Sequence, residues 1–362
     1  MRLLGHLLLA VACATSSAWS SESEPIGYLR TDVHAPVALS PSATVDLTYH
    51  LTNICPVPVL LGIDSNSYQP LFIQVMTLVK GVDPRTVTDV WGPPTEDTLI
   101  PDLTKIAVSG VGLMGTANWL PRWPARDGII LLPDEGYARR ITFHAGWIDE
   151  KALPKQAKDW LVINAAPPLR AAQPVKEPAA VVPGKPIRFG PMSAVMVPGV
   201  RAVPFARAAR QVEAARPPLV PKEHDLQVAI EVDATVEAGK DLTVTYLIGN
   251  TGTRPVWVRP NDLVPAKVTW ECVRGDKVLA TIDGSGLAAM TALLPERPAV
   301  ALNPGEYLTW RRTLLASQLP LKKGLPCAMR ISLAAPYFTE RPEGAVEARM
   351  VQLQGSAELQ VR

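Results

Sequence analysis

Residues Asp241–Pro260 read DLTVTYLIGNTGTRPVWVRP, and this stretch decides the predicted fold. In its first half apolar residues alternate with their neighbours, the period of two that is typical of a strand with one face in a core. Asn250–Thr253 then supplies turn chemistry, since Gly and Asn tolerate a positive φ at little cost. The alternation resumes at Val256. The stretch therefore predicts a strand, a turn and a second strand.

The same unit occurs earlier in the chain. At an offset of 197 positions (246 minus 49), Tyr49 corresponds to Tyr246 and Asn53 to Asn250. Two more matches follow in the same order: Leu132–Tyr137 with Leu302–Tyr307, and Ala165–Pro167 with Ala334–Pro336. Three matches in one order predict a duplicated domain.

Length and composition limit the class of protein. The chain has 362 residues and a mass of 39.1 kDa, enough for two ordinary domains with a core each. Its 36 prolines, against 5 Phe and 7 Tyr, favour short strands with frequent turns over helices. A formal net charge of +2 gives no reason to expect nucleic acid as a partner.

These observations predict an all-β protein made of two tandem immunoglobulin-like β-sandwich domains. We expect a signal peptide over residues 1–20, copy one over 25–198, a Pro/Ala/Arg-rich linker over 199–221 and copy two over 222–362.

The first residues have the pattern of a secretory signal peptide. Met1-Arg2 is a short positive region, Leu3–Ala14 is apolar apart from His6, and Ala18–Ser20 is a small-residue cleavage site apart from its Trp19. We therefore expect a periplasmic or secreted protein without a transmembrane segment. A lipid anchor through Cys13 is the less favoured alternative, because the Leu that usually precedes the small residues is missing.

Three cysteines remain after removal of the signal peptide. Cys272 and Cys327 each lie on the apolar face of a predicted strand, which an inter-sheet disulfide requires, and export to an oxidising compartment favours that bridge. Two separate buried thiols are the alternative. Cys55 has no obvious partner.

Copy one carries an insertion that copy two lacks. Asn53 to Leu132 spans 79 positions and Asn250 to Leu302 spans 52, so copy one has about 27 more residues there. The insertion holds Trp91, Trp119 and Trp123. These rings form a partner-contact surface in one interpretation. In the favoured alternative they fold back and cover a sheet edge or the end of a core.

Signatures of catalysis, of a metal site and of a cofactor are absent from the sequence. The five histidines are scattered, and none has a second ligand at helical metal-site spacing. His50 alternates with Tyr49, so a surface or edge position is expected for it. No Gly-x-Ser-x-Gly elbow and no phosphate-binding loop occurs. The sequence predicts no catalytic, cofactor-binding or metal-binding residue.

Two motifs of copy two resemble known modules. Asn250-Thr251-Gly252 at a strand end, followed by Leu302-Asn303-Pro304-Gly305-Glu306, is similar to immunoglobulin-like modules of the bacterial envelope. The intracellular proteinase inhibitor family of bacilli is similar in the same two places. The resemblance covers about fifteen residues, carries no inhibitory residue over to this chain, and implies a β-sandwich.

Together these features predict an exported, non-enzymatic binding or scaffold protein of the cell envelope. A protein or polysaccharide of the envelope is the expected partner. A proteinase inhibitor is the alternative that the resemblance favours, and an enzyme whose site only the fold assembles is a further one.

Overall fold

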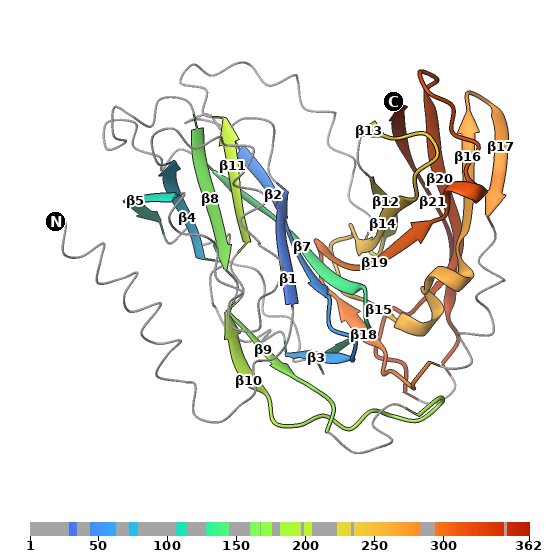
Figure 1. Cartoon of the computed structure of the whole chain (residues 1–362). Helices are drawn as coiled ribbons and strands as arrows, with labels where there is room; N and C mark the ends of the chain where they lie inside the picture. The colour runs from blue at the N-terminus through green and yellow to red at the C-terminus, as the bar shows by residue number, and fades with distance from the viewer. Residues whose placement is uncertain are drawn as a thin grey trace.

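The computed structural model shows an all-β protein (Figure 1). It describes residues 29–34, 44–62, 72–78, 106–113, 128–144, 160–166, 168–175, 182–196, 199–204, 223–232, 235–282, 294–343 and 346–362. Short 3-10 turns interrupt the strands of copy two at η4 (Pro260–Asp262), η5 (Pro265–Lys267) and η7 (Ala316–Gln318). Among the described residues no helix has the length and apolar character needed to cross a membrane.

Both copies have the strand order of an immunoglobulin-like sandwich. In copy two the first layer is β12 (Leu226–Val232), β14 (Leu242–Asn250) and β19 (Glu306–Leu314). The second layer is β13 (Thr235–Val236), β21 (Arg349–Val361), β20 (Cys327–Tyr337), β16 (Thr269–Arg274) and β17 (Lys277–Ile282). The small sheet of β15 (Val256–Val258) and β18 (Val300–Leu302) closes one end.

Copy one repeats this arrangement. Its first layer is β1 (Leu29–His34), β2 (Thr44–Asn53) and β7 (Glu135–His144). Its second layer is β11 (Gly199–Pro204), β8 (Trp160–Ala166), β4 (Phe72–Leu78) and β5 (Ile106–Leu113). The end sheet is β10 (Ser193–Met196), β9 (Pro168–Ala172), β3 (Val59–Gly62) and β6 (Ile129–Leu131). The immunoglobulin-like expectation is confirmed by this strand order.

The alternating residues of the strands form the core, as the sequence predicts. In copy two Tyr246 of β14 stacks on Trp310 of β19 at 5.1 Å between ring centroids and meets Trp270 of β16 edge-on at 5.6 Å. Because β16 belongs to the opposite layer, this aromatic cluster joins the two sheets. The Tyr246 hydroxyl is also satisfied, since it donates to the Leu263 carbonyl at 2.7 Å.

The duplicated tyrosines and asparagines are structurally equivalent. Tyr49 pairs with Arg139 of β7, and Tyr246 pairs with Trp310 of β19, the corresponding strand. The Asn53 amide donates to the carbonyls of Val57 and Leu131, both at 3.0 Å. Asn250 makes the same two bonds, to Arg254 at 2.7 Å and Leu302 at 2.8 Å. The asparagine thus ties each strand end to the turn that follows and to the end sheet.

The second sequence match is shifted by one residue in the structure. Glu135 accepts the Leu132 amide at 3.0 Å, and Glu306 accepts the Asn303 amide at 2.8 Å. The two glutamates are therefore equivalent, at an offset of 171 (306 minus 135). Asp134, with φ of 62°, takes the place of Gly305, with φ of 78°. The sequence match had aligned Glu306 with Gly136.

The two copies are joined edge to edge in one sheet. The order β1-β2-β7-β19-β14-β12 runs through both, with β7 antiparallel to β19 (Figure 1). Tyr137 of β7 pairs with Leu308 of β19. Leu308 is also the residue of copy two that corresponds to Tyr137 at the offset of 171. The sheet therefore has a pseudo-two-fold axis through this pair. The tandem arrangement expected from the sequence did not include a shared sheet.

The first residues of the expected linker form a strand: Gly199–Pro204 is β11 and pairs with β8 of copy one. Further backbone bonds tie copy one to copy two: Gly184 donates to Leu294, and Glu296 donates to Lys185, both at 3.0 Å. The signal peptide, Cys13 and the rest of the predicted linker lie outside the described residues.

Candidate functional site

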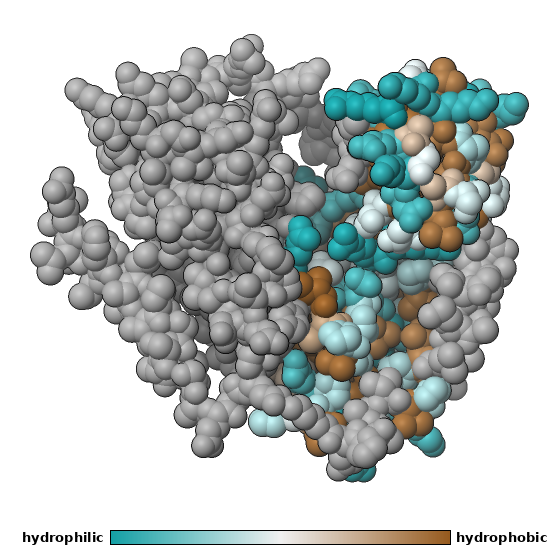
Figure 2. Space-filling model, viewed as in Figure 1, coloured by the Kyte–Doolittle hydropathy of each residue, from teal (hydrophilic) through white to brown (hydrophobic). Residues whose placement is uncertain are grey.

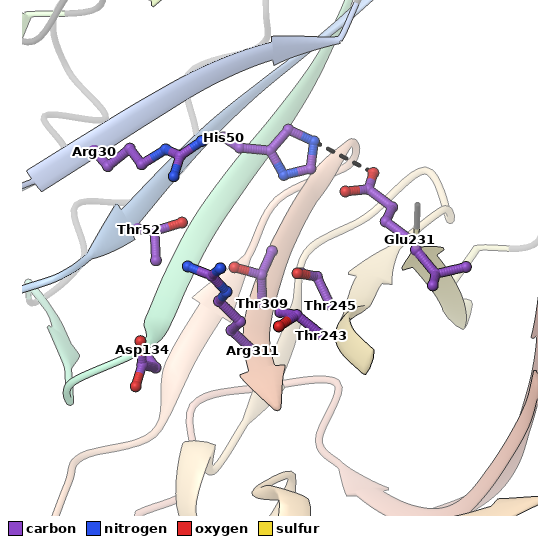
Figure 3. Close-up of a pocket in the computed structure, with 10 residues that line it drawn as sticks. Arg30, His50, Thr52, Asp134, Glu231, Thr243, Thr245, Thr309 and Arg311 are labelled. Atoms are coloured by element: carbon purple, nitrogen blue, oxygen red, sulfur yellow. Dashed lines mark ion pairs between the residues drawn. The ribbon is translucent and has the colours of Figure 1, made fainter. Parts of the chain in front are cut away.

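A groove lies on the outer face of the six-stranded sheet, opposite the core (Figure 3). It is open to solvent and has a volume of about 270 Å³. Copy one contributes Arg30, His50, Thr52 and Asp134, and copy two contributes Glu231, Val232, Thr243, Thr245, Thr309 and Arg311. Figure 2 shows hydrophilic residues in the middle of this face, where β19 and β14 lie in Figure 1. The groove is thus polar and is shared by both copies.

The groove exists because the shared sheet curls strongly. His50 lies on β2 and Glu231 on β12, with β7, β19 and β14 between them. Four strand spacings in a flat sheet would separate these strands by about 19 Å. In the structure His50 Nε2 lies 3.5 Å from Glu231 Oε1 (Figure 3). The curvature brings the two walls together, and this histidine–carboxylate pair spans the groove.

Gly136 lies in the middle of the curled sheet. It pairs with Thr52 on one side and with Thr309 on the other. A Cβ at this position would collide with the Thr309 hydroxyl and the Leu51 carbonyl. Glycine is therefore required where the two halves of the groove meet.

A set of threonine hydroxyls lines the floor of the groove. Thr243 and Thr245 alternate along β14 with the buried Val244 and Tyr246, so they face outward. Thr309 does the same on β19 and is buried by the walls around it. A hydroxyl both donates and accepts hydrogen bonds, so this surface suits a ligand rich in polar groups.

The charged groups of the groove differ in their surroundings. His50 and Glu231 pair with each other when the histidine is protonated. Arg311 has no ion-pair partner among the described residues, and its guanidinium reaches toward Thr52 in the view of Figure 3. Arg30 brings a second guanidinium from β1, while Asp134 supplies a carboxylate at the rim. Cationic groups thus face the groove from both copies.

A buried ionic cluster holds the two halves of the site together. Glu135 of β7 forms an ion pair with Arg297 and accepts the Trp310 indole at 3.0 Å. Arg297 also donates to Asn261 Oδ1 at 2.6 Å and to the Ile130 carbonyl at 3.3 Å. Because the carboxylate belongs to copy one and its charged partner to copy two, the cluster fixes how the copies meet.

The equivalent carboxylate makes the mirrored contact. Glu306 of copy two accepts the Tyr137 hydroxyl of copy one at 2.8 Å, and both side chains are buried. Each glutamate therefore closes its own turn and holds an aromatic side chain of the other copy. The groove rests on a rigid joint, which is the support that a binding site requires.

The expected disulfide is absent from the structure. Cys272 and Cys327 are buried free thiols, as is Cys55. Cys272 lies on β16 and Cys327 on β20. These strands are neighbours in one sheet, so the expected inter-sheet geometry is wrong. Burial, together with the neighbouring Cys327 thiol, raises the pKa of Cys272 to about 11. Such thiols stay protonated near neutral pH and are poor nucleophiles.

The sequence-predicted contact residues cannot be placed relative to the groove. Trp91, Trp119 and Trp123 lie outside the described residues. His50, expected at the surface or an edge, does face away from the core, yet only 5% of it is exposed because the groove encloses it. The alternation along β2 gave its direction. The curl that buries it depends on a distant part of the chain.

Comparisons with known proteins add little to this picture. No protein-family model matches the chain, and no curated protein matches its sequence. A CARDB domain from Pyrococcus furiosus, solved with di-metal ions, is 14% identical over 40% of this chain and 93% of that one, with a TM-score of 0.20. A marsupial T cell receptor is 8% identical over 92% of this chain and 72% of that one, with a TM-score of 0.17. Likenesses at this level carry no argument about function.

Proposed function

We propose that this protein is a non-enzymatic binding or scaffold protein of the cell envelope and that the groove is its contact site. The observation that carries the proposal is the His50–Glu231 pair across the groove, because it shows that one polar site is built jointly by both copies. Polar groups converging in a concave site are the usual sign of a ligand site. The envelope location rests on the signal-peptide pattern of residues 1–20.

The buried joint beneath the groove supports a binding role. Binding costs less free energy when a site is already in its bound geometry. Here the Glu135–Arg297 pair and the β7–β19 pairing hold the two walls in place. In the described part of the chain no cluster of three or more His, Cys, Asp or Glu side chains could hold a metal ion.

Affinity capture from an envelope fraction tests the proposal. The wild-type chain is compared with Thr245→Trp, which fills the groove, and with Thr253→Trp on an exposed turn as the matched control. We expect capture of envelope material to be lost with Thr245→Trp and kept with Thr253→Trp, with all three proteins melting at the same temperature.

Other outcomes assign the function elsewhere. Loss of capture on replacing Trp91, Trp119 and Trp123 by Ala, with no effect of Thr245→Trp, would place the contact on the copy-one insertion. Stoichiometric inhibition of an exported protease by the wild-type chain would indicate a proteinase inhibitor. Turnover of envelope polymer would indicate an enzyme.

A further inference from the structure

We propose that the groove binds a small hydroxylated carboxylic acid, of the chemical class of the uronic acids found in acidic polysaccharides. This inference rests on the proposed function and gives its groove a ligand. It follows from the kinds of polar group that face the cavity and from the cavity's size.

The carboxylate of such a ligand fits the cationic side of the groove. Arg311 is exposed and has no carboxylate partner among the described residues, so its guanidinium is available to a ligand. Guanidinium groups bind carboxylates through two parallel hydrogen bonds. Arg30 adds positive charge from the other copy.

The hydroxyls of the ligand fit the remaining polar groups. Thr243, Thr245 and Thr309 offer hydroxyls that donate and accept. Asp134 offers carboxylate oxygens, which accept only, and the Glu231 carboxylate adds acceptor oxygens beside its contact with His50. A ligand with several hydroxyls can donate to these carboxylates and accept from the threonines, so each polar group of the groove finds a complement.

The same carboxylates argue against phosphate as the preferred ligand. Phosphate carries about 1.5 to 2 negative charges at neutral pH and has fewer hydroxyls to donate than a sugar acid. Asp134 and Glu231 would repel it. A singly charged acid with donor hydroxyls meets one guanidinium with its carboxylate and the acidic groups with its hydroxyls.

The size of the cavity agrees with one sugar unit. A volume of 270 Å³ lies just below the range of about 300–1,000 Å³ that small-molecule pockets occupy. A single sugar ring with its carboxylate fills such a space, whereas a longer chain must leave through the open side.

Isothermal titration of the full chain with glucuronate, galacturonate, glucose and inorganic phosphate tests the ligand class. We expect a uronate to bind, with glucose and phosphate each at least about tenfold weaker, since glucose lacks the charge-assisted bond. Arg311→Gln should lower uronate affinity about tenfold and leave the weak glucose signal unchanged. Arg349→Gln, an exposed arginine of β21 away from the groove, is the matched control and should change neither.

The proposal is overturned if no uronate binds, if glucose or phosphate binds as well as the uronates, or if Arg311→Gln binds uronate like the wild type. Binding lost equally in Arg349→Gln and Arg311→Gln would show general charge attraction and would also overturn it. The two proposals fail in different ways. If envelope capture depends on the groove but no uronate binds, only the proposed ligand class is contradicted. If a uronate binds but capture is insensitive to Thr245→Trp, the proposed contact role of the groove is contradicted.

Discussion

Glu135 and Glu306 occupy the same place in the two copies, but their surroundings have diverged. Each closes a turn by accepting the amide three residues earlier. Glu135 then holds an indole and a buried arginine of copy two, whereas Glu306 holds a phenol of copy one. The equivalent of Trp310 is Arg139, and that of Tyr137 is Leu308. The two copies share the residues that set the backbone and differ in the residues that fill the joint.

The largest loss of stability should come from removing the charged partner of Glu135. Arg297→Met leaves that carboxylate buried without its cation, and breaking a buried pair in this way costs about 3–5 kcal/mol. Urea unfolding monitored by tryptophan fluorescence should show a loss of this size. Arg254→Met, which breaks the exposed pair with Glu223, should cost about 0–1 kcal/mol.

A second variant separates the lost pair from lost packing. In Glu135→Gln/Arg297→Met neither charge remains, so we expect much of the stability to return. A double variant as unstable as Arg297→Met alone would contradict the importance of the ion pair and would assign the effect to the arginine's packing or to its bonds with Asn261 and Ile130.

The asparagines test whether the copies are equally dependent on their shared motif. Asn53→Ala and Asn250→Ala each remove two hydrogen bonds donated to carbonyls and one accepted from a backbone amide, that of Cys55 or of Gly252. Because the partners of these bonds are partly or fully buried, we expect each variant to lose about 2–3 kcal/mol. Chemical denaturation of both variants measures the two losses. A loss confined to one copy would show that the other holds its turn by different contacts.

The smallest effect concerns the paired core tyrosines at high pH. Burial raises the pKa of both Tyr49 and Tyr246 well above the usual value near 10. The contribution of the two tyrosines to the free energy of unfolding is therefore complete below pH 10. It is lost as the pH rises from 10 toward the pKa of the folded state, because the tyrosines of the unfolded chain lose their protons first. At one pH unit above the usual pKa, the ionisation of each tyrosine in the unfolded chain should lower the free energy of unfolding by about 1.4 kcal/mol. Urea midpoints from pH 8 to 11 should fall less in Tyr246→Phe and in Tyr49→Phe than in the wild type. Equal slopes in all three proteins would contradict this.

The sequence was sufficient for what depends on local periodicity. The alternation around Tyr246 predicts the strand and its inward face, and the repeat of Asn250 predicts the equivalent turn. The second match failed by one residue for a local reason. Copy one places Asp134, and not a glycine, at the positive φ. The match was anchored instead on Leu132 with Leu302 and on Tyr137 with Tyr307, which puts Glu135 opposite Gly305, one residue away from Glu306.

The joint and the groove could not be predicted in the same way. The pairing of Tyr137 with Leu308 connects strands far apart in the chain, and an outward Thr245 gives no sign of which residues will share a groove with it. The closeness of His50 and Glu231 depends on the curl of five strands together. Alternation gives the direction of a side chain, and only the assembled sheet gives its neighbours.

The pairing of β7 with β19 makes the contact between the two halves independent of protein concentration. An edge strand that joins an equivalent strand about a two-fold axis forms the kind of contact that holds a symmetric homodimer. In a homodimer such a contact weakens on dilution. Within one chain the contact is intramolecular and persists at any dilution. The two sides of the joint can also carry different side chains, as Trp310 and Arg139 do at equivalent positions.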